Sequence, residues 1–215
     1  MIKRREFSIH LAGAGLALTA AGRALAQAPV EGTHYIKLAQ PLPASMLPPP
    51  GKIDVSEFFW YECPHCNTFE PLLEPWAQKL PADVAFRRVP VGFSARHQVA
   101  QKLYYALEEI GALEQVHRKI FAAIHTQGQR LLSEKDAVAL ATAAGANKDK
   151  LIEAYKSFQV NTKAAKARQL ADAYKVDGVP LLGIDGRYFT SASLTGSHEK
   201  ALLVADYLIQ RSRKS

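Results

Sequence analysis

Residues 57–69 read EFFWYECPHCNTF, an apolar and aromatic run that ends in two cysteines separated by proline and histidine. The stretch 52–60 (KIDVSEFFW) is rich in β-branched and aromatic residues, which is typical of a strand in the centre of a sheet. Pro64 suits the first turn of a helix, because the N–H that proline lacks would have no partner there. The sequence therefore predicts that a strand passes directly into a helix, with Cys63 at the helix N-terminus.

Cys63 and Cys66 are the only two cysteines in the chain. A disulfide between them closes so small a ring that it removes little entropy from the unfolded chain, which argues against a structural role. A zinc site needs about four ligands, and a c-type haem needs a histidine directly after the second cysteine, where this chain has Asn67. We therefore expect no metal and no cofactor, and we interpret the pair as a site of thiol–disulfide exchange.

The expected helix position makes Cys63 a reactive thiol. Free N–H groups and the positive end of a helix stabilise a thiolate, and we expect His65 to be the main side-chain stabiliser. A stabilised thiolate favours the reduced form and so makes the disulfide a stronger oxidant. Glu62 has the opposite effect, because a carboxylate beside a thiol opposes its ionisation. The sequence thus leaves the oxidising strength open.

The first 26 residues have the features of a secretory signal. Residues 3–5 (KRR) form a basic start, small apolar residues follow at 11–21, and 24–26 (ALA) offers a cleavage site that would make Gln27 the mature N-terminus. The basic start also resembles a twin-arginine export signal, so the twin-arginine and Sec routes both remain open. We expect the periplasm of a bacterium, where disulfides form and persist.

The charge of the chain gives little support for a nucleic-acid partner. The full sequence has a formal net charge of +7, and removal of residues 1–26 leaves about +4, which is only mildly basic. The remaining basic clusters are short, and no dense basic stripe is interleaved with aromatic residues. We therefore expect no nucleic-acid binding.

The rest of the chain changes from a sheet pattern to a helix pattern and back. Residues 84–91 (VAFRRVPV) predict a second strand, parallel to the first by the usual right-handed crossover. Apolar residues at helical spacing predict five helices between about 95 and 174. Asp185-Gly186 predicts a two-residue hairpin, and a final helix is expected over about 197–211.

A sheet unit interrupted by a helical insert explains this order with one core and one satellite domain. We expect an α/β fold with a first sheet part at 27–94, an inserted helical domain at 95–170 and a second sheet part at 171–215. Pro71 and Pro75 are expected to bend the first helix.

The run EFFWYECPHC, the proline of GVP at 178–180 and the helical block between them resemble the DsbA family of periplasmic thiol:disulfide oxidoreductases. The resemblance covers about residues 35–211. It implies a thioredoxin fold with an inserted all-helical domain, oxidation of unfolded exported proteins, and reoxidation by a DsbB-like membrane quinone oxidoreductase. We expect a monomer, because residues 27–50 are too short for the dimerisation domain that isomerases of this class usually need.

The resemblance also assigns roles to single residues. It implies a cis peptide bond between Val179 and Pro180, whose backbone would offer N–H and C=O groups to an extended substrate. Glu57 lies where the family carries a buried acid below the active site, and Arg88 lies where a basic partner is expected. An alternating strand would equally allow Glu57 at the surface. The catalytic residues implied are those of the motif: Cys63, Pro64, His65 and Cys66.

Two other functions are compatible with the sequence. One is a disulfide isomerase or reductase of similar fold, and the other is a peptide-binding module whose cysteines are inert. The remaining histidines in the helical regions have no ligand spacing with one another or with a cysteine, and we interpret them as packing or surface residues: His97, His117, His125 and His198.

Overall fold

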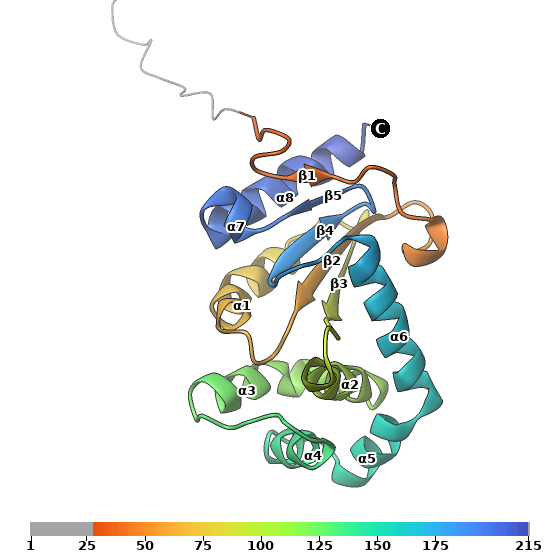
Figure 1. Ribbon diagram of the computed structural model, residues 1–215, viewed down its shortest axis with the longest axis vertical. Coiled ribbons are helices and arrows are strands. Elements are labelled where there is room, and N and C mark those ends of the chain that lie inside the picture. Colours follow the sequence, from red (N-terminus) through yellow and green to blue (C-terminus); the bar gives the residue numbers. More distant parts are fainter. Residues whose placement is uncertain (1–27, 215) are drawn as a thin grey trace, which may run out of the picture.

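The computed structural model describes residues 28–214, and its centre is a five-stranded mixed sheet (Figure 1). The strand order is β1-β5-β4-β2-β3; β2 and β3 run parallel, and the other neighbouring strands run antiparallel. The expected signal peptide lies outside the described residues. The strands are β1 (Ile36–Lys37), β2 (Ile53–Phe59), β3 (Val84–Pro90), β4 (Leu181–Ile184) and β5 (Tyr188–Thr190).

The helices fall into two groups. Helices α1 and α8 pack on one face of the sheet. Of the inserted helices α2 to α6, α6 packs on the other face, and α2 to α5 lie beyond the end of β2 and β3 (Figure 1). The helices are η1 (Ala44–Met46), α1 (Pro64–Ala77), α2 (Ala95–Glu109), α3 (Leu113–His125), α4 (Glu134–Ala143), α5 (Lys148–Lys156), α6 (Phe158–Ala173), α7 (Ala192–Thr195) and α8 (His198–Ser212).

Strand β2 is central because both of its faces are covered. Val55 packs in the cluster formed with α1 and α8, whereas Phe58 contacts Tyr174 beyond the end of α6, with ring centroids 5.3 Å apart. Successive side chains of a strand point to opposite faces. A strand that is buried on both faces is therefore apolar without strict alternation, as this one is.

The predicted passage from strand to helix is confirmed. Cys63 is the N-cap residue of α1 and Pro64 is its first helical residue. The helix continues through Pro71 and Pro75 to Ala77, so neither proline ends it. The first thiol is thus held at the N-terminus of a helix of 14 residues.

The inserted block contains the five expected helices, α2 to α6. The proposed division at residue 170 falls within α6, which runs on to Ala173. The hairpin prediction is also confirmed, because Asp185 and Gly186 both have positive φ, 55° and 60°, as a tight two-residue turn requires. Helix α7 was not expected. None of the described helices has the length and apolarity that crossing a bilayer requires.

Candidate active site

The two thiols lie at the junction of β2 and α1 in different surroundings. Both cysteines are free; Cys63 is 7% exposed and Cys66 is 1% exposed. The Cys63 thiol donates to the carbonyl oxygen of Val179 across a distance of 3.4 Å. Cys63 is therefore the less buried thiol and lies against the backbone that precedes Pro180, whereas Cys66 is almost fully buried.

Hydrogen bonds make the Cys63 thiol unusually acidic. The thiol of Cys66 lowers the pKa of Cys63 most, and the N–H groups of Cys66 and His65 add to this against the opposing effect of burial, so the pKa falls from 9.0 to about 6. The positive charge of His65 makes a smaller contribution. This order corrects the expectation that His65 is the main side-chain stabiliser, because the Cys66 thiol has that role.

Cys66 has the opposite character. Burial, followed by the neighbouring Cys63 sulfur, raises the pKa of Cys66 well above its ordinary value, and the charge of Glu57 acts in the same direction. Cys63 is thus the better leaving thiolate, and Cys66 is the sulfur that holds its proton. Such a pair can exchange disulfides in a fixed order.

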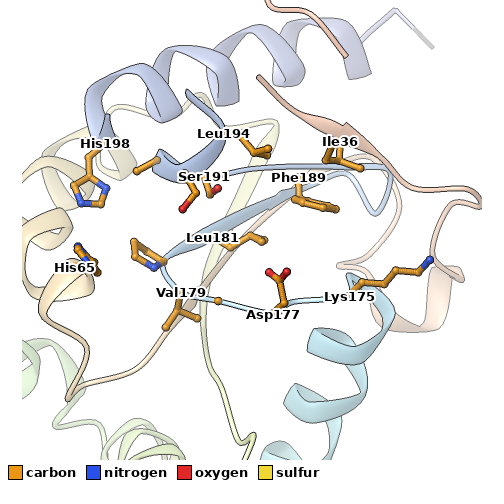
Figure 2. A pocket seen from close by; sticks show the side chains of 14 residues that line it. Ile36, His65, Lys175, Asp177, Val179, Leu181, Phe189, Ser191, Leu194 and His198 are labelled. Carbon is orange, nitrogen blue, oxygen red and sulfur yellow. The ribbon is translucent and has the colours of Figure 1, made fainter. Parts of the chain in front are cut away.

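A groove of about 580 Å³ borders the motif (Figure 2). The Val179–Pro180 peptide bond is cis, as the resemblance implied. In Figure 2, His65 and His198 point toward one another at one end of the groove, and Lys175 and Asp177 lie toward the other end. Burial and then the charge of His65 lower the pKa of His198.

Glu57 is buried, so the surface interpretation is wrong. It is 1% exposed and lies opposite Arg88 in the parallel register of β2 and β3. The Nε atom of Arg88 lies 3.2 Å from Oε2 of Glu57, but neither atom is aligned for a hydrogen bond. Arg88 instead donates from Nη2 to Oε1 of Glu70 on α1, at 2.5 Å. Arg88 therefore lies between two buried carboxylates.

The two carboxylates differ in acidity. The pKa of Glu57 is raised to about 8. Burial is the largest cause and the charge of Glu70 is the second, and together they outweigh the lowering effect of Arg88. Burial also opposes ionisation of Glu70, but His117 and Arg88 together hold the pKa of Glu70 below its ordinary value. Glu70 is thus the anion of this cluster, and Glu57 holds a proton near neutral pH.

Glu62 does not face Cys63 as an isolated charge. Its two carboxylate oxygens accept from Nε and Nη2 of Arg96 at 3.0 and 2.9 Å. The Arg96 guanidinium also lies over the Trp60 ring, 5.5 Å from its centroid. The positive charge of Arg96 therefore offsets the effect that Glu62 alone would have on the neighbouring thiol.

The sequence analysis missed three residues near the site, Glu70 on α1 and His117 and His125 on α3. Glu70 follows Cys66 by one helical turn, so the spacing could have placed both on the buried face of α1. His117 and His125 lie on one face of α3, eight residues apart, and both form hydrogen bonds with Tyr61. Nothing in the local sequence predicts that contact.

The sequence and the fold have counterparts among known proteins. The DSBA-like thioredoxin domain matches residues 72–206, a range that begins just after the motif. A thiol:disulfide interchange protein DsbA from Azotobacter vinelandii is 40% identical over 207 residues, which is 95% of this chain and 95% of that protein. This alignment spans the two cysteines.

The chain belongs to the DSBA-like thioredoxin domain family. A second DsbA, from Bordetella parapertussis, is 41% identical over 212 residues, or 97% of this chain and 98% of that protein. The crystal structure of Pseudomonas aeruginosa DsbA aligns with a TM-score of 0.82 and 38% identity, covering 86% of this chain and 95% of that one. The protein is a DsbA-like thiol:disulfide oxidoreductase with a thioredoxin fold and a helical insertion, as predicted.

Proposed function

We propose that this DsbA-like protein introduces disulfide bonds into unfolded proteins in the bacterial periplasm, and that Cys63 is the sulfur that substrates attack. The observation that carries the proposal is the difference between the two thiols. Cys63 is the less buried thiol and has a pKa of about 6, and Cys66 is buried with its pKa well above the ordinary value. Stabilisation of the Cys63 thiolate favours the reduced pair, so the oxidised pair is a strong acceptor of electrons.

The first step forms a mixed disulfide. A substrate thiolate attacks the sulfur of Cys63, the bond between Cys63 and Cys66 breaks, and Cys66 leaves with the electron pair of that bond. Because Cys66 is a weak acid in its buried site, it takes up a proton. Glu57 holds a proton near neutral pH, and its ionised form raises the pKa of Cys66, so we assign Glu57 and Arg88 the role of modulating this proton uptake.

The second step releases the product. A second substrate thiolate attacks the substrate sulfur of the mixed disulfide, and Cys63 leaves as a thiolate. Its low pKa makes it a good leaving group. Two electrons have then passed from the substrate to the cysteine pair, and we propose that a DsbB-like membrane quinone oxidoreductase removes them.

The groove beside Pro180 is suited to an extended peptide. The carbonyl of Val179 already accepts the Cys63 thiol, so a substrate cysteine bonded to Cys63 lies against the same backbone. His65 lines this groove directly after Pro64, which opens the helix. We assign substrate binding to Val179 and Pro180 on this basis.

The proposed location is supported by the sequence and by the family, and the proposed assembly state by the sequence. The signal-like residues 1–26 and the bacterial relatives support export to the periplasm, by the twin-arginine or the Sec route. We propose that the protein acts as a monomer on its protein substrates. Size-exclusion chromatography with light scattering and N-terminal sequencing of the exported protein test these two points.

An equilibrium with glutathione, read by alkylation of free thiols, tests the function. We expect the cysteine pair to become reduced even when oxidised glutathione is in excess, and the oxidised protein to transfer its disulfide to reduced, unfolded ribonuclease. A Cys63→Ser variant should do neither. An isomerase would instead rearrange scrambled ribonuclease faster than it oxidises the reduced enzyme, and a module with inert cysteines would show neither activity.

A further inference from the structure

Helix α3 of the inserted block contacts the loop that joins β2 to α1. Figure 1 shows α3 beneath this loop. The helix presents three residues at intervals of four, His117, Phe121 and His125, and all three lie against Tyr61 or its neighbour Phe59. Tyr61 is the second residue before Cys63, so this contact lies immediately before the nucleophile.

The two histidines hold Tyr61 by different atoms. Nε2 of His125 lies 2.8 Å from the carbonyl oxygen of Tyr61. A carbonyl oxygen only accepts hydrogen bonds, so His125 carries its proton on Nε2 and donates. Nδ1 of His117 lies 2.7 Å from the hydroxyl oxygen of Tyr61. One contact therefore fixes the backbone of Tyr61, and the other fixes its side chain.

The other face of His117 lies toward Glu70. Nε2 of His117 is 3.6 Å from Oε2 of Glu70, which is beyond hydrogen-bond distance. Burial lowers the pKa of His117, which favours the neutral ring. The hydrogen bond between Nδ1 of His117 and the Tyr61 hydroxyl is therefore the one that holds this side chain.

Packing leaves Tyr61 a single position. The residue is fully buried, and the rings of Phe59, Phe121 and His117 surround it with centroids 5.2, 5.1 and 5.2 Å away. Between Tyr61 and Cys63 there is only Glu62. The N–H of Cys63 donates to the carbonyl of Trp60 at 3.0 Å, so the turn from 60 to 63 is closed. A displacement of Tyr61 would therefore reach Cys63 directly.

We propose that His117 and His125 are positioning residues that clamp Tyr61 at two points and so hold Cys63 in the N-cap geometry that stabilises its thiolate. The proposal rests on the function proposed above, because it explains how the reactive state of Cys63 is maintained. It gives the inserted helices a part in the redox chemistry. The Cys63 thiolate is stabilised by N–H groups at the start of α1, which act only while the sulfur stays at the helix N-terminus.

Tyr61→Phe is the least disruptive test, because it removes one hydroxyl and keeps the buried ring. We expect the pKa of Cys63, read from thiolate absorbance, to rise. The equilibrium with glutathione should shift toward the oxidised protein about threefold to tenfold, the range that one lost hydrogen bond produces. Tyr155→Phe is the matched control. It also removes a buried tyrosine's hydrogen bond within the inserted block, to the carbonyl of Val99, without touching Tyr61.

Variants of His125 test the backbone contact. His125→Phe keeps the stacking on Phe121 but removes the hydrogen-bond donor. Like Tyr61→Phe, it should raise the pKa of Cys63 and shift the equilibrium with glutathione toward the oxidised protein. His125→Gln places an amide N–H near the position of Nε2 and should restore them. A merely structural role would lower the melting temperature of His125→Phe without moving the Cys63 titration. If the His125 variants do not fold, Tyr61→Phe decides alone.

The outcomes separate this proposal from the function on which it rests. An ordinary Cys63 pKa in the wild-type protein would overturn the proposed function. The clamp alone would be overturned by a different result: Cys63 is acidic in the wild type, but the glutathione equilibrium constants of Tyr61→Phe and His125→Phe are both within twofold of that of the Tyr155→Phe control. Shifts in both variants, with recovery in His125→Gln, support it.

Discussion

Strands β2 and β3 carry two buried ion clusters on opposite faces of the same pair of strands. Ser56 lies opposite Arg87 in the register, and Glu57 lies opposite Arg88. Adjacent residues point to opposite faces, so one cluster lies toward η1 and the other toward α1 and the cysteines. Each contains an arginine and a carboxylate with 1% exposure, Asp54 in the first and Glu57 in the second.

The two clusters differ in how completely they are bonded. Oδ2 of Asp54 accepts hydrogen bonds from Ser56 at 2.8 Å and from Arg87 at 3.2 Å. One oxygen of each acid, Oδ1 of Asp54 and Oε2 of Glu57, has no hydrogen-bond partner among the described residues. The difference between the clusters lies in the two hydrogen bonds that Oδ2 of Asp54 accepts. Burial raises the pKa of both acids, but only Glu57 is moved as far as about 8.

The comparison teaches that burial alone does not make a site reactive. Asp54 is as buried as Glu57, yet its hydrogen bonds oppose the cost of its charge. Glu57 lacks such bonds because Arg88 donates to Glu70 instead. The cluster with fewer hydrogen bonds to its buried acid is the one beside the thiols, which is where a shifted pKa can serve the chemistry.

The largest expected difference between the clusters is in stability. Arg88→Met removes the cation between Glu57 and Glu70. Because Glu57 is protonated at neutral pH, the buried Glu70 anion is the charge left without its arginine, which should cost roughly 3–5 kcal/mol of unfolding free energy. Arg87→Met leaves one carboxylate, and the Arg87 side chain is 38% exposed, so water can enter. We therefore expect Arg87→Met to lower the unfolding free energy by about 1–3 kcal/mol. Urea unfolding of the oxidised proteins measures both.

A second variant at the same site provides the control for this prediction. Glu70→Gln added to Arg88→Met removes the charge that lost its arginine and should recover part of the lost stability. If Arg87→Met proves as destabilising as Arg88→Met, or if the added Glu70→Gln recovers nothing, the electrostatic distinction between the two clusters does not hold.

A smaller difference is expected in the pH dependence of stability. The pKa of Glu57 in the folded protein, about 8, lies above its ordinary value of 4.5. The ionised form is therefore disfavoured by folding, and stability that is fully present below pH 4.5 is lost as the pH rises through 8. Glu57→Gln should remove this loss and stabilise the oxidised protein at pH 9 by up to a few kcal/mol, whereas Asp54→Asn should change the profile less.

Melting curves between pH 4.5 and 9 measure this effect, and the oxidised state keeps the cysteines from titrating. Equal pH profiles for wild type and Glu57→Gln would show that Glu57 is ionised without cost. The two clusters would then be equivalent in acidity despite their different hydrogen bonds.

The features that the sequence predicted well are local. The passage from β2 to α1, the five inserted helices and the Asp185-Gly186 hairpin each depend on neighbours in the chain, and each was found. Helix α7 was missed because four residues carry too little periodicity to be seen. The cysteine pair was predictable for the same reason, since its reactivity comes from its own helix terminus.

The features that the sequence could not decide depend on tertiary packing. The sequence allowed Glu57 to face either solvent or the core. A strand without strict alternation of polar and apolar residues does not show which of its side chains are buried. The roles of Glu70 and His117 appear only when α1, β3 and α3 meet. The prediction that His65 is the main side-chain stabiliser of the Cys63 thiolate was wrong for a related reason. The sequence of the motif does not show which hydrogen-bond donors point at the sulfur.

A third ion pair sharpens the comparison, because it lies next to Cys63 in the sequence but Arg96 is 46% exposed. Arg96→Met leaves the Glu62 carboxylate without its cation beside the thiol, which should raise the pKa of Cys63. Ion pairs with a solvent-exposed partner are screened by water and contribute about 0.2–1 kcal/mol, so we expect the pKa of Cys63 to rise by less than one unit and the stability to change little. Thiolate absorbance against pH measures it.

Two controls decide whether burial or closeness to the sulfur sets the size of such effects. Glu62→Gln added to Arg96→Met should return the Cys63 titration to that of the wild type. High salt should shrink the effect of Arg96→Met, because the Arg96 side chain is exposed to solvent. A rise of several units that persists in 1 M salt would mean that the exposed pair acts as strongly as a buried one. The degree of burial would then not explain why Glu57 and Asp54 differ from Glu62.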